Sequence, residues 1–144
     1  MLSLYLNTKG FRQEYGVDFD EIFSPVVKMT TLRFMLDVVV ADNLELIQLD
    51  VKTAFLHGDL KEEIYMEQPK GFVATGQEHL VCRLRKSLYS LKQAPRQWYK
   101  KFDDFIRSVG FSKSDEDHCL FTKTAQDGSP VFLKTRCEND IPPR

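Results

Sequence analysis

Apolar and polar residues alternate through residues 44–51, and this pattern predicts a β-strand that ends near Asp50. The polar positions interrupt the apolar ones with a period near two: Leu44, Glu45, Leu46, Gln48, Leu49, Asp50 and Val51. A short helical turn is expected next, closed by His57-Gly58. A carboxylate at this point can cap the turn or can hold a metal ion in a cleft, and the pattern alone leaves both interpretations open.

Two segments have the 3.6-residue spacing of amphipathic helices. The first starts at Thr30 or Thr31, either of which can cap a helix, and ends at Asp42-Asn43. The second carries Pro95 in its first turn and stops at Gly110. The positions expected to face the core are Leu32, Met35, Leu36, Val39 and Val40 in the first helix, and Trp98, Phe102, Phe105, Ile106 and Val109 in the second.

The remaining predicted elements are short strands and turns. Strands are expected over residues 63–67 and 80–84, with a loop over residues 71–77 between them. A hairpin is expected over residues 117–135, with its turn at 126–129. Because strands and helices do not alternate regularly, the predicted fold class is α+β.

Length and composition fit one soluble globular domain. The 144 residues are 42% hydrophobic and 28% charged, which argues against a collagen-like, wholly disordered or membrane protein. No apolar run approaches the ~20 residues of a membrane helix, and the first residues lack the basic region of a signal peptide. Three cysteines without zinc-site spacing, Cys82, Cys119 and Cys137, are typical of reduced thiols, so an intracellular protein is expected.

The net charge of −1 argues against a globally basic nucleic-acid-binding protein, but the charge is unevenly spread. Between His79 and Phe102 there are seven basic residues and no acidic one: Arg83, Arg85, Lys86, Lys92, Arg96, Lys100 and Lys101. A basic face of this kind can bind phosphates, and it can equally be an ordinary solvated surface.

Several longer motifs are specific enough to point to a family. They are Lys9-Gly10-Phe11-Arg12-Gln13, the segments 15–27 and 48–58, Ile64-Tyr65-Met66-Glu67-Gln68-Pro69, Gly71-Phe72 and the segment 87–99. Together they resemble the reverse transcriptase domain of copia-type retrotransposons, with the resemblance extending to about Phe132. The resembling part is taken as residues 9–133, with residues 1–8 and 134–144 outside it and the latter expected to be disordered.

The resemblance implies the fingers-and-palm part of a right-hand polymerase, in which an antiparallel sheet packs on helices. Such enzymes are RNA-directed DNA polymerases that add deoxynucleotides to a primer 3′-hydroxyl, using two divalent ions held by carboxylates. Asp50 matches the family's first catalytic aspartate. The backbone carbonyl of Val51 would be a further ligand to Mg²⁺ or Mn²⁺ and would lie close to the nucleotide.

The resemblance also implies contacts to the nucleotide and to an RNA/DNA primer–template. Phe55 matches the aromatic position under the sugar that excludes a 2′-hydroxyl, although a phenylalanine there can also be core. Lys92 and Arg96 lie in the family's second palm motif and, with Arg83 and Arg85, are candidates to contact phosphates; ordinary solvent exposure is the alternative. Trp98 can stack on a base, but its place on the apolar stripe favours core packing.

The departures from the family predict an incomplete active site. The other two catalytic aspartates belong to a Tyr-x-Asp-Asp turn, and this sequence does not contain that motif. Asp103-Asp104 lies on a helix rather than at a hairpin tip. The expected strand begins as Val131-Phe132-Leu133 but then turns polar at Lys134-Thr135-Arg136, so no apolar strand fixes Glu138 and Asp140 as substitutes. Since one carboxylate cannot hold two ions, a two-metal site is not expected to form and polymerisation is expected to be lost.

Two further departures affect the fingers and the turn before the second helix. Tyr5 stands where the family usually has a fingers arginine, while Lys9 is retained. Ser90 replaces a usual glycine, which would strain the turn by ~1 kcal/mol if its φ is positive. The predicted function is therefore an inactive fragment of a copia-type reverse transcriptase. The alternatives are a non-catalytic nucleic-acid-binding remnant, or an unstable product of a decayed element whose exposed sheet edge favours aggregation.

Overall fold

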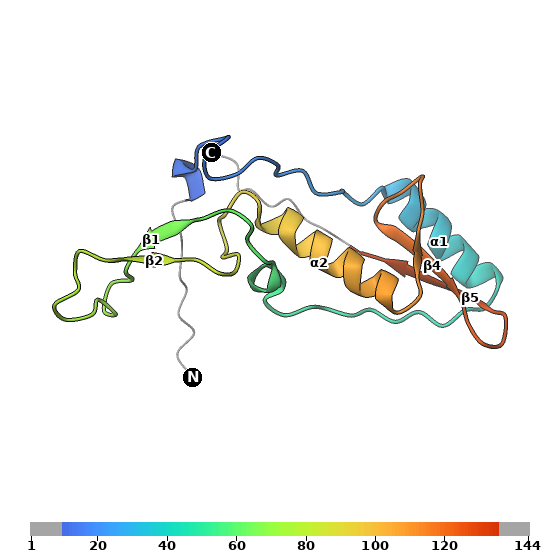
Figure 1. Ribbon diagram of the computed structural model, residues 1–144. Helices are drawn as coiled ribbons and strands as arrows, with labels where there is room; N and C mark the ends of the chain where they lie inside the picture. The colour runs from blue at the N-terminus through green and yellow to red at the C-terminus, as the bar shows by residue number, and fades with distance from the viewer. Residues whose placement is uncertain (1–9, 136–144) are drawn as a thin grey trace. The chain divides into compact units, whose positions relative to one another are not determined.

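The computed structural model describes residues 10–135, and this part of the chain is α+β, as predicted (Figure 1). It contains two α-helices and two small antiparallel sheets. The described residues form two compact units, one of residues 10–23 and Thr53–Lys101 and the other of Ser24–Lys52 and residues 102–135. Tyr5, Lys9, Cys137, Glu138 and Asp140 lie outside the described residues.

The first unit holds a two-stranded sheet built from two of the predicted strands. β1 (Tyr65–Glu67) pairs antiparallel with β2 (Val81–Arg83), with Met66 opposite Cys82. The core beside the sheet consists of buried Ile64, Leu91 and Ala94, with four half-buried side chains packed against them: Phe55, Leu60, Leu84 and Leu88. Short helical turns lie at η1 (Gly10–Arg12) and η2 (Ala54–His57).

The loop between β1 and β2 is organised by one side chain. The Gln68 side-chain nitrogen donates to the backbone oxygens of Gln77, at 2.7 Å, and Leu80, at 2.9 Å. Its side-chain oxygen accepts from the backbone N–H of Ala74 at 2.9 Å. Because these three bonds tie Gln68, just after β1, to backbone groups at residues 74, 77 and 80, the connection between the strands keeps a defined path.

The predicted second helix is confirmed as α2 (Ala94–Ser108), with Pro95 in its first turn and Gly110, at a φ of 93°, just beyond its end. It begins in the first unit and continues into the second. The expected buried stripe is only partly right, because Ile106 is buried whereas Phe105 is 61% and Val109 41% exposed. The spacing correctly marks these positions as one apolar face, but burial of each position depends on what lies against it.

The second unit contains the predicted hairpin. β4 (Leu120–Thr124) pairs antiparallel with β5 (Pro130–Lys134), and β3 (Ser112–Lys113) pairs with the other edge of β4. Phe121 of β4 is fully buried and meets the Phe102 ring edge-on, with centroids 5.9 Å apart. Of the two cysteines in the described part of the chain, Cys119 is buried and Cys82 half-buried.

The prediction for the first helix needs two corrections. α1 (Met29–Ala41) starts one residue before the earlier of the two expected positions, and its N-cap Lys28 makes no side-chain capping bond. None of its residues is buried, and Val40 is 81% exposed, so the expectation that its apolar stripe is core is wrong. Amphipathic spacing predicts which face is apolar, but another element has to cover that face before it becomes core.

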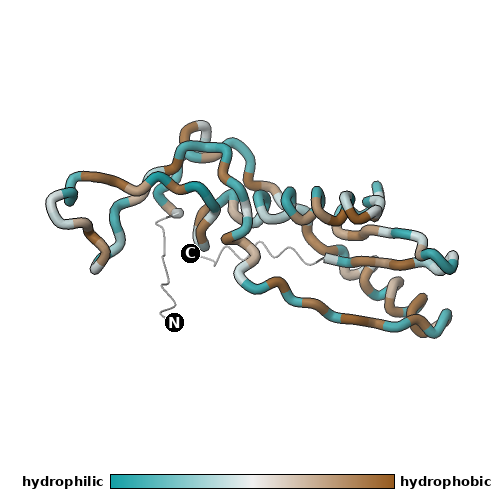
Figure 2. The backbone as a smooth tube through the Cα atoms, turned by 60° about the horizontal axis from the view of Figure 1, so that its bottom comes forward, coloured by the Kyte–Doolittle hydropathy of each residue, from teal (hydrophilic) through white to brown (hydrophobic). Residues whose placement is uncertain are grey.

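The predicted strand through Asp50 is absent from the described part of the chain. Residues 44–51 are assigned to neither sheet, and three of the apolar side chains that were expected to pack are well exposed: Leu46 at 65%, Ile47 at 69% and Leu49 at 85%. The run does carry apolar positions among polar ones (Figure 2), as the sequence pattern indicated, but no neighbouring strand pairs with it among the described residues. A strand needs a neighbour to accept and donate its ladder hydrogen bonds.

Candidate metal and nucleic-acid site

Asp50 lies on the unpaired run of the second unit and is exposed to solvent. Val51, whose carbonyl was expected to join it, is 47% exposed. Within residues 10–135, no three histidine, cysteine or acidic side chains gather where they could hold a metal ion. Because Mg²⁺ needs about six oxygen ligands in octahedral geometry, Asp50 and a carbonyl do not fit a two-metal centre by themselves.

The turn after Asp50 contains a strained residue that the sequence did not indicate. Thr53 has a φ of 55° and a ψ of 34°, the left-handed region, which β-branched residues rarely adopt. The predicted helical turn follows as η2, closed by Gly58. Phe55 in η2 packs on the first unit's core and meets the Tyr89 ring edge-on at 5.7 Å. Its contacts here are therefore those of a core residue, and its role toward a sugar stays a prediction.

Lys92 contacts the segment of residues 13–19 in the first unit. Its ammonium donates to the backbone oxygen of Gln13 at 3.1 Å and lies 4.8 Å from the centre of the Phe19 ring. Next to it, the fully buried Gln93 accepts from the Gln13 side chain and donates to the Asp18 backbone oxygen, both at 3.0 Å. These contacts join residues 13–19 to the start of α2. Nothing in the sequence pointed to Gln93, because a single glutamine carries no periodic signal.

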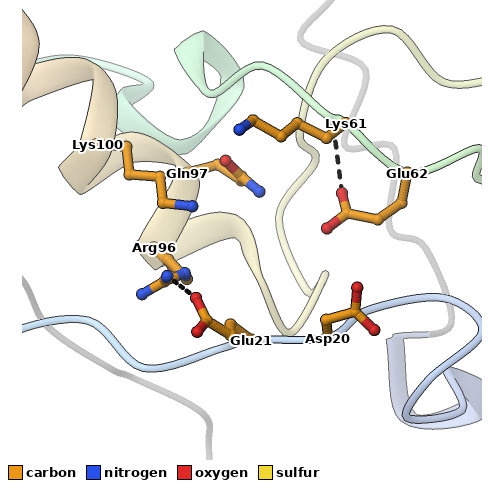
Figure 3. Close-up of a pocket in the computed structure, with 7 residues that line it drawn as sticks. All are labelled: Asp20, Glu21, Lys61, Glu62, Arg96, Gln97 and Lys100. Carbon is orange, nitrogen blue, oxygen red and sulfur yellow. Dashed lines mark hydrogen bonds and ion pairs between the residues drawn. The ribbon is translucent and has the colours of Figure 1, made fainter.

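Arg96 is also engaged within the first unit. Its guanidinium donates to the Phe23 backbone oxygen at 3.0 Å and forms an ion pair with Glu21. The residue borders a pocket of about 500 Å³ whose lining mixes both charges (Figure 3): Asp20, Glu21, Lys61, Glu62, Arg96, Gln97 and Lys100. With as many carboxylates as cations, the pocket has no excess of positive charge to attract a polyphosphate.

The other two candidate phosphate contacts differ from each other. Arg83 forms an ion pair with Glu63 at 2.7 Å, and both side chains are 60% exposed, so this pair adds little stability. Arg85 is exposed and makes no ion pair with the residues that the structure describes. The candidate site residues are thus divided between the two units, since Asp50 and Val51 belong to the second and the other five to the first.

Ser90 adopts a φ of 78°, which is the conformation that the glycine usual in this motif predicted. Close by, Gly10 is buried, and a Cβ added there would lie 1.7 Å from the Ser90 backbone oxygen. The turn at Ser90 therefore leaves no room for a side chain at position 10. At position 90 itself, serine occupies a left-handed conformation that glycine would adopt without strain.

One cluster of charges was not recognised in the sequence. The Asp59 carboxylate accepts from the ammonium of Lys86 and, at 3.0 Å, from that of Lys101. The hydrogen bonds from Lys86 and Lys101 hold the pKa of Asp59 below its usual value, and the bond to Asp59 raises the pKa of Lys86. The three residues are far apart in the chain, so no local pattern could have grouped them.

The comparisons with known proteins identify the family. A family described as reverse transcriptase (RNA-dependent DNA polymerase) matches residues 4–134 of the chain. The chain therefore belongs to the reverse transcriptase family, and its resemblance to copia-type elements is confirmed by the relatives below. Neither described helix has the length and apolar run that crossing a lipid bilayer requires.

The similar proteins are much longer than this chain. The Retrovirus-related Pol polyprotein from transposon TNT 1-94 of Nicotiana tabacum is 58% identical over 128 residues, which are 89% of this chain and 10% of that protein. The corresponding polyprotein from transposon RE2 of Arabidopsis thaliana is 48% identical over 94% of this chain and 9% of its own length. A putative transposon Ty5-1 protein of Saccharomyces cerevisiae is 35% identical over 59% of this chain and 27% of its own length. No solved structure matches the chain significantly.

Proposed function

We propose that the chain is a fingers-and-palm fragment of a copia-type reverse transcriptase that binds nucleic acid but does not polymerise by itself. Family membership supports descent from an RNA-directed DNA polymerase. The observation that carries the loss of activity is the exposed Asp50 without companions, since no three potential ligands converge within residues 10–135. A polymerase site stabilises its transition state through two clamped ions, so an incomplete ligand set removes most of the rate enhancement.

Asp50 keeps a defined role in this proposal. Its carboxylate and the Val51 carbonyl supply oxygen ligands of the kind that Mg²⁺ and Mn²⁺ prefer, and the Tyr-x-Asp-Asp motif that would add two further carboxylates does not occur in this sequence. Phe55 would contact the sugar of a deoxynucleotide, and its edge-on contact with the Tyr89 ring would help to orient it. Asp50 and Val51 would hold an ion only together with further oxygen ligands, and among residues 10–135 no cluster of acidic, histidine or cysteine side chains offers them.

The nucleic-acid-binding part of the proposal rests on the basic segment. The cations between Arg83 and Lys101 come from β2, the following turn and α2, all within the first unit. Phosphate contacts supply most non-specific affinity for nucleic acid and make it salt-dependent. We expect the primer–template to be an RNA/DNA or DNA duplex, bound more weakly as the salt concentration rises.

A primer-extension experiment tests the loss of catalysis. Mg²⁺-dependent incorporation of a deoxynucleotide on a primed RNA template is measured for the wild-type chain and for Asp50→Asn, with a complete copia-type reverse transcriptase as positive control. No incorporation by either chain is expected. Incorporation by the wild type that disappears in Asp50→Asn would overturn the proposal, because Asp50 would then belong to a working metal site.

A further inference from the structure

A cluster of two lysines, one aspartate and two aromatic rings lies on the first unit. It contains none of the four candidate phosphate contacts named from the sequence, which are Arg83, Arg85, Lys92 and Arg96. We propose that this cluster, named the Asp59 surface and formed by His57, Asp59, Lys86, Trp98 and Lys101, is where the first unit contacts nucleic-acid phosphates. The inference rests on the proposed nucleic-acid binding. It adds where on the first unit the phosphates bind, and it adds that the Asp59 carboxylate lowers the affinity for them.

Close packing of the backbone brings the cluster together. Gly58 accepts a hydrogen bond from the backbone N–H of Ser87 at 2.9 Å, and Asp59 forms an antiparallel bridge with Lys86. On its other side Gly58 is in contact with α2, since an added Cβ would meet the Gln97 Cβ at 2.9 Å. The turn is therefore held between the residue 86–87 backbone and the helix, and a single carboxylate reaches both lysines.

The Asp59 surface carries a net positive charge and is open to solvent. Two ammonium groups face one carboxylate, and the side chains of Lys86, Lys101 and Asp59 are 50%, 43% and 63% exposed. By contrast, Lys92 and Arg96 donate to backbone oxygens of their own unit.

The aromatic pair beside the charges favours nucleic acid over a simple anion. The rings of His57 and Trp98 lie 6.2 Å apart, at the same turn and the same helix that carry Asp59 and Lys101. Cations that follow a phosphate backbone, together with aromatic rings beside them, are the usual composition of a surface that binds nucleic acid without sequence preference. Asp59 opposes the approach of a phosphate, so it lowers the affinity that the two lysines would otherwise give.

Binding of the whole chain to a labelled primer annealed to an RNA template, followed by fluorescence anisotropy against salt, tests the inference. Lys86→Gln/Lys101→Gln is expected to weaken binding about 50-fold at ~0.1 M salt and to reduce the salt slope by about 1.8, or roughly 0.9 per lost contact. Asp59→Asn is expected to strengthen binding severalfold, because it removes the opposing charge. The matched control, Arg33→Gln/Lys70→Gln, changes the net charge equally at exposed residues outside the cluster. Its salt slope should differ from that of the wild type by less than about 0.9, the value of one phosphate contact.

The outcomes separate this inference from the proposed function. If the wild type binds no primer–template, the proposed function itself fails. If the wild type binds and Lys86→Gln/Lys101→Gln keeps the full salt slope, while Arg83→Gln/Arg85→Gln loses it, the inference is overturned and the function stands. Damage to the fold cannot imitate the expected result, because Asp59→Asn and the lysine variant must shift the affinity in opposite directions. Emission from Trp98, the chain's single tryptophan, should also change on binding.

Discussion

Ser90 and Gly10 show at the scale of single residues how a local conformation limits which side chain is acceptable. At a φ of 78°, Ser90 pays the penalty of a left-handed conformation that glycine avoids. We expect Ser90→Gly to raise the free energy of unfolding by about 1 kcal/mol. Urea denaturation followed by circular dichroism measures this change. Ser90→Ala serves as control, since it removes the hydroxyl but keeps the strain, and an equal gain from alanine would contradict the explanation.

Asp117 and Lys134 form a buried ion pair, with side chains 3% and 8% exposed. Removing one partner leaves an uncompensated buried charge, so Asp117→Asn is expected to lower the free energy of unfolding by about 3–5 kcal/mol. The double variant Asp117→Asn/Lys134→Met should lose less than the sum of the two single changes, as a double-mutant cycle would reveal. Additive losses would mean that the two charges do not depend on each other.

The same pair predicts how stability depends on pH. Burial raises the pKa of Asp117, but hydrogen bonds from Lys134, from the Cys119 backbone N–H and from Thr31 outweigh it, and the net shift is downward. A carboxyl whose folded pKa lies below its unfolded value stabilises the fold above the unfolded pKa and loses this contribution as the pH falls through the folded value. Stability should therefore decline below about pH 4, and Asp117→Asn should flatten that decline in acid-titration melts.

At the scale of elements, the local pattern predicted most helices and strands correctly, with the strand through Asp50 as the exception, but it predicted their buried faces poorly. The strands β1 and β2, the helix α2 with Pro95 in its first turn, and the β4–β5 hairpin all appear where spacing and turn residues predicted them. The buried faces of the helices were less predictable, because burial depends on what lies opposite. Phe105 has the right spacing for the core and remains 61% exposed.

The loop between β1 and β2 offers a test at this scale. Gln68→Ala removes the three hydrogen bonds that organise the loop, so hydrogen exchange of the Ala74 amide and protease cleavage within residues 70–79 should both become faster. The effect on global unfolding should stay below about 1–2 kcal/mol, because the loop is at the surface. Gln77→Ala is the matched control, since it keeps the backbone oxygen that accepts from Gln68; equal acceleration in that variant would contradict the role of Gln68.

At the scale of the whole molecule, the exposed apolar run over residues 44–51 is the feature with the largest consequence. Leu49 is 85% exposed and Leu46 65%, on backbone that pairs with no strand among the described residues. Such a segment can pair with another chain, so we expect the protein to associate as its concentration rises. Leu46→Lys/Leu49→Lys should reduce this association in sedimentation velocity, whereas Val73→Lys/Val81→Lys, which adds the same charge at other exposed positions, should not. Equal solubility gains from both variants would indicate a general charge effect.

The sequence by itself determined the family, the α+β class and most secondary structure, because motifs, turn residues and periodic spacing are local and are written directly in the chain. Only the tertiary structure decided which side chains meet. It placed Lys92 on Gln13, joined Lys86 and Lys101 through Asp59, and left the Asp50 run without a strand partner. The physical reason is that burial, ion pairing and ladder hydrogen bonds depend on groups distant in the sequence, and no spacing rule within one segment specifies them.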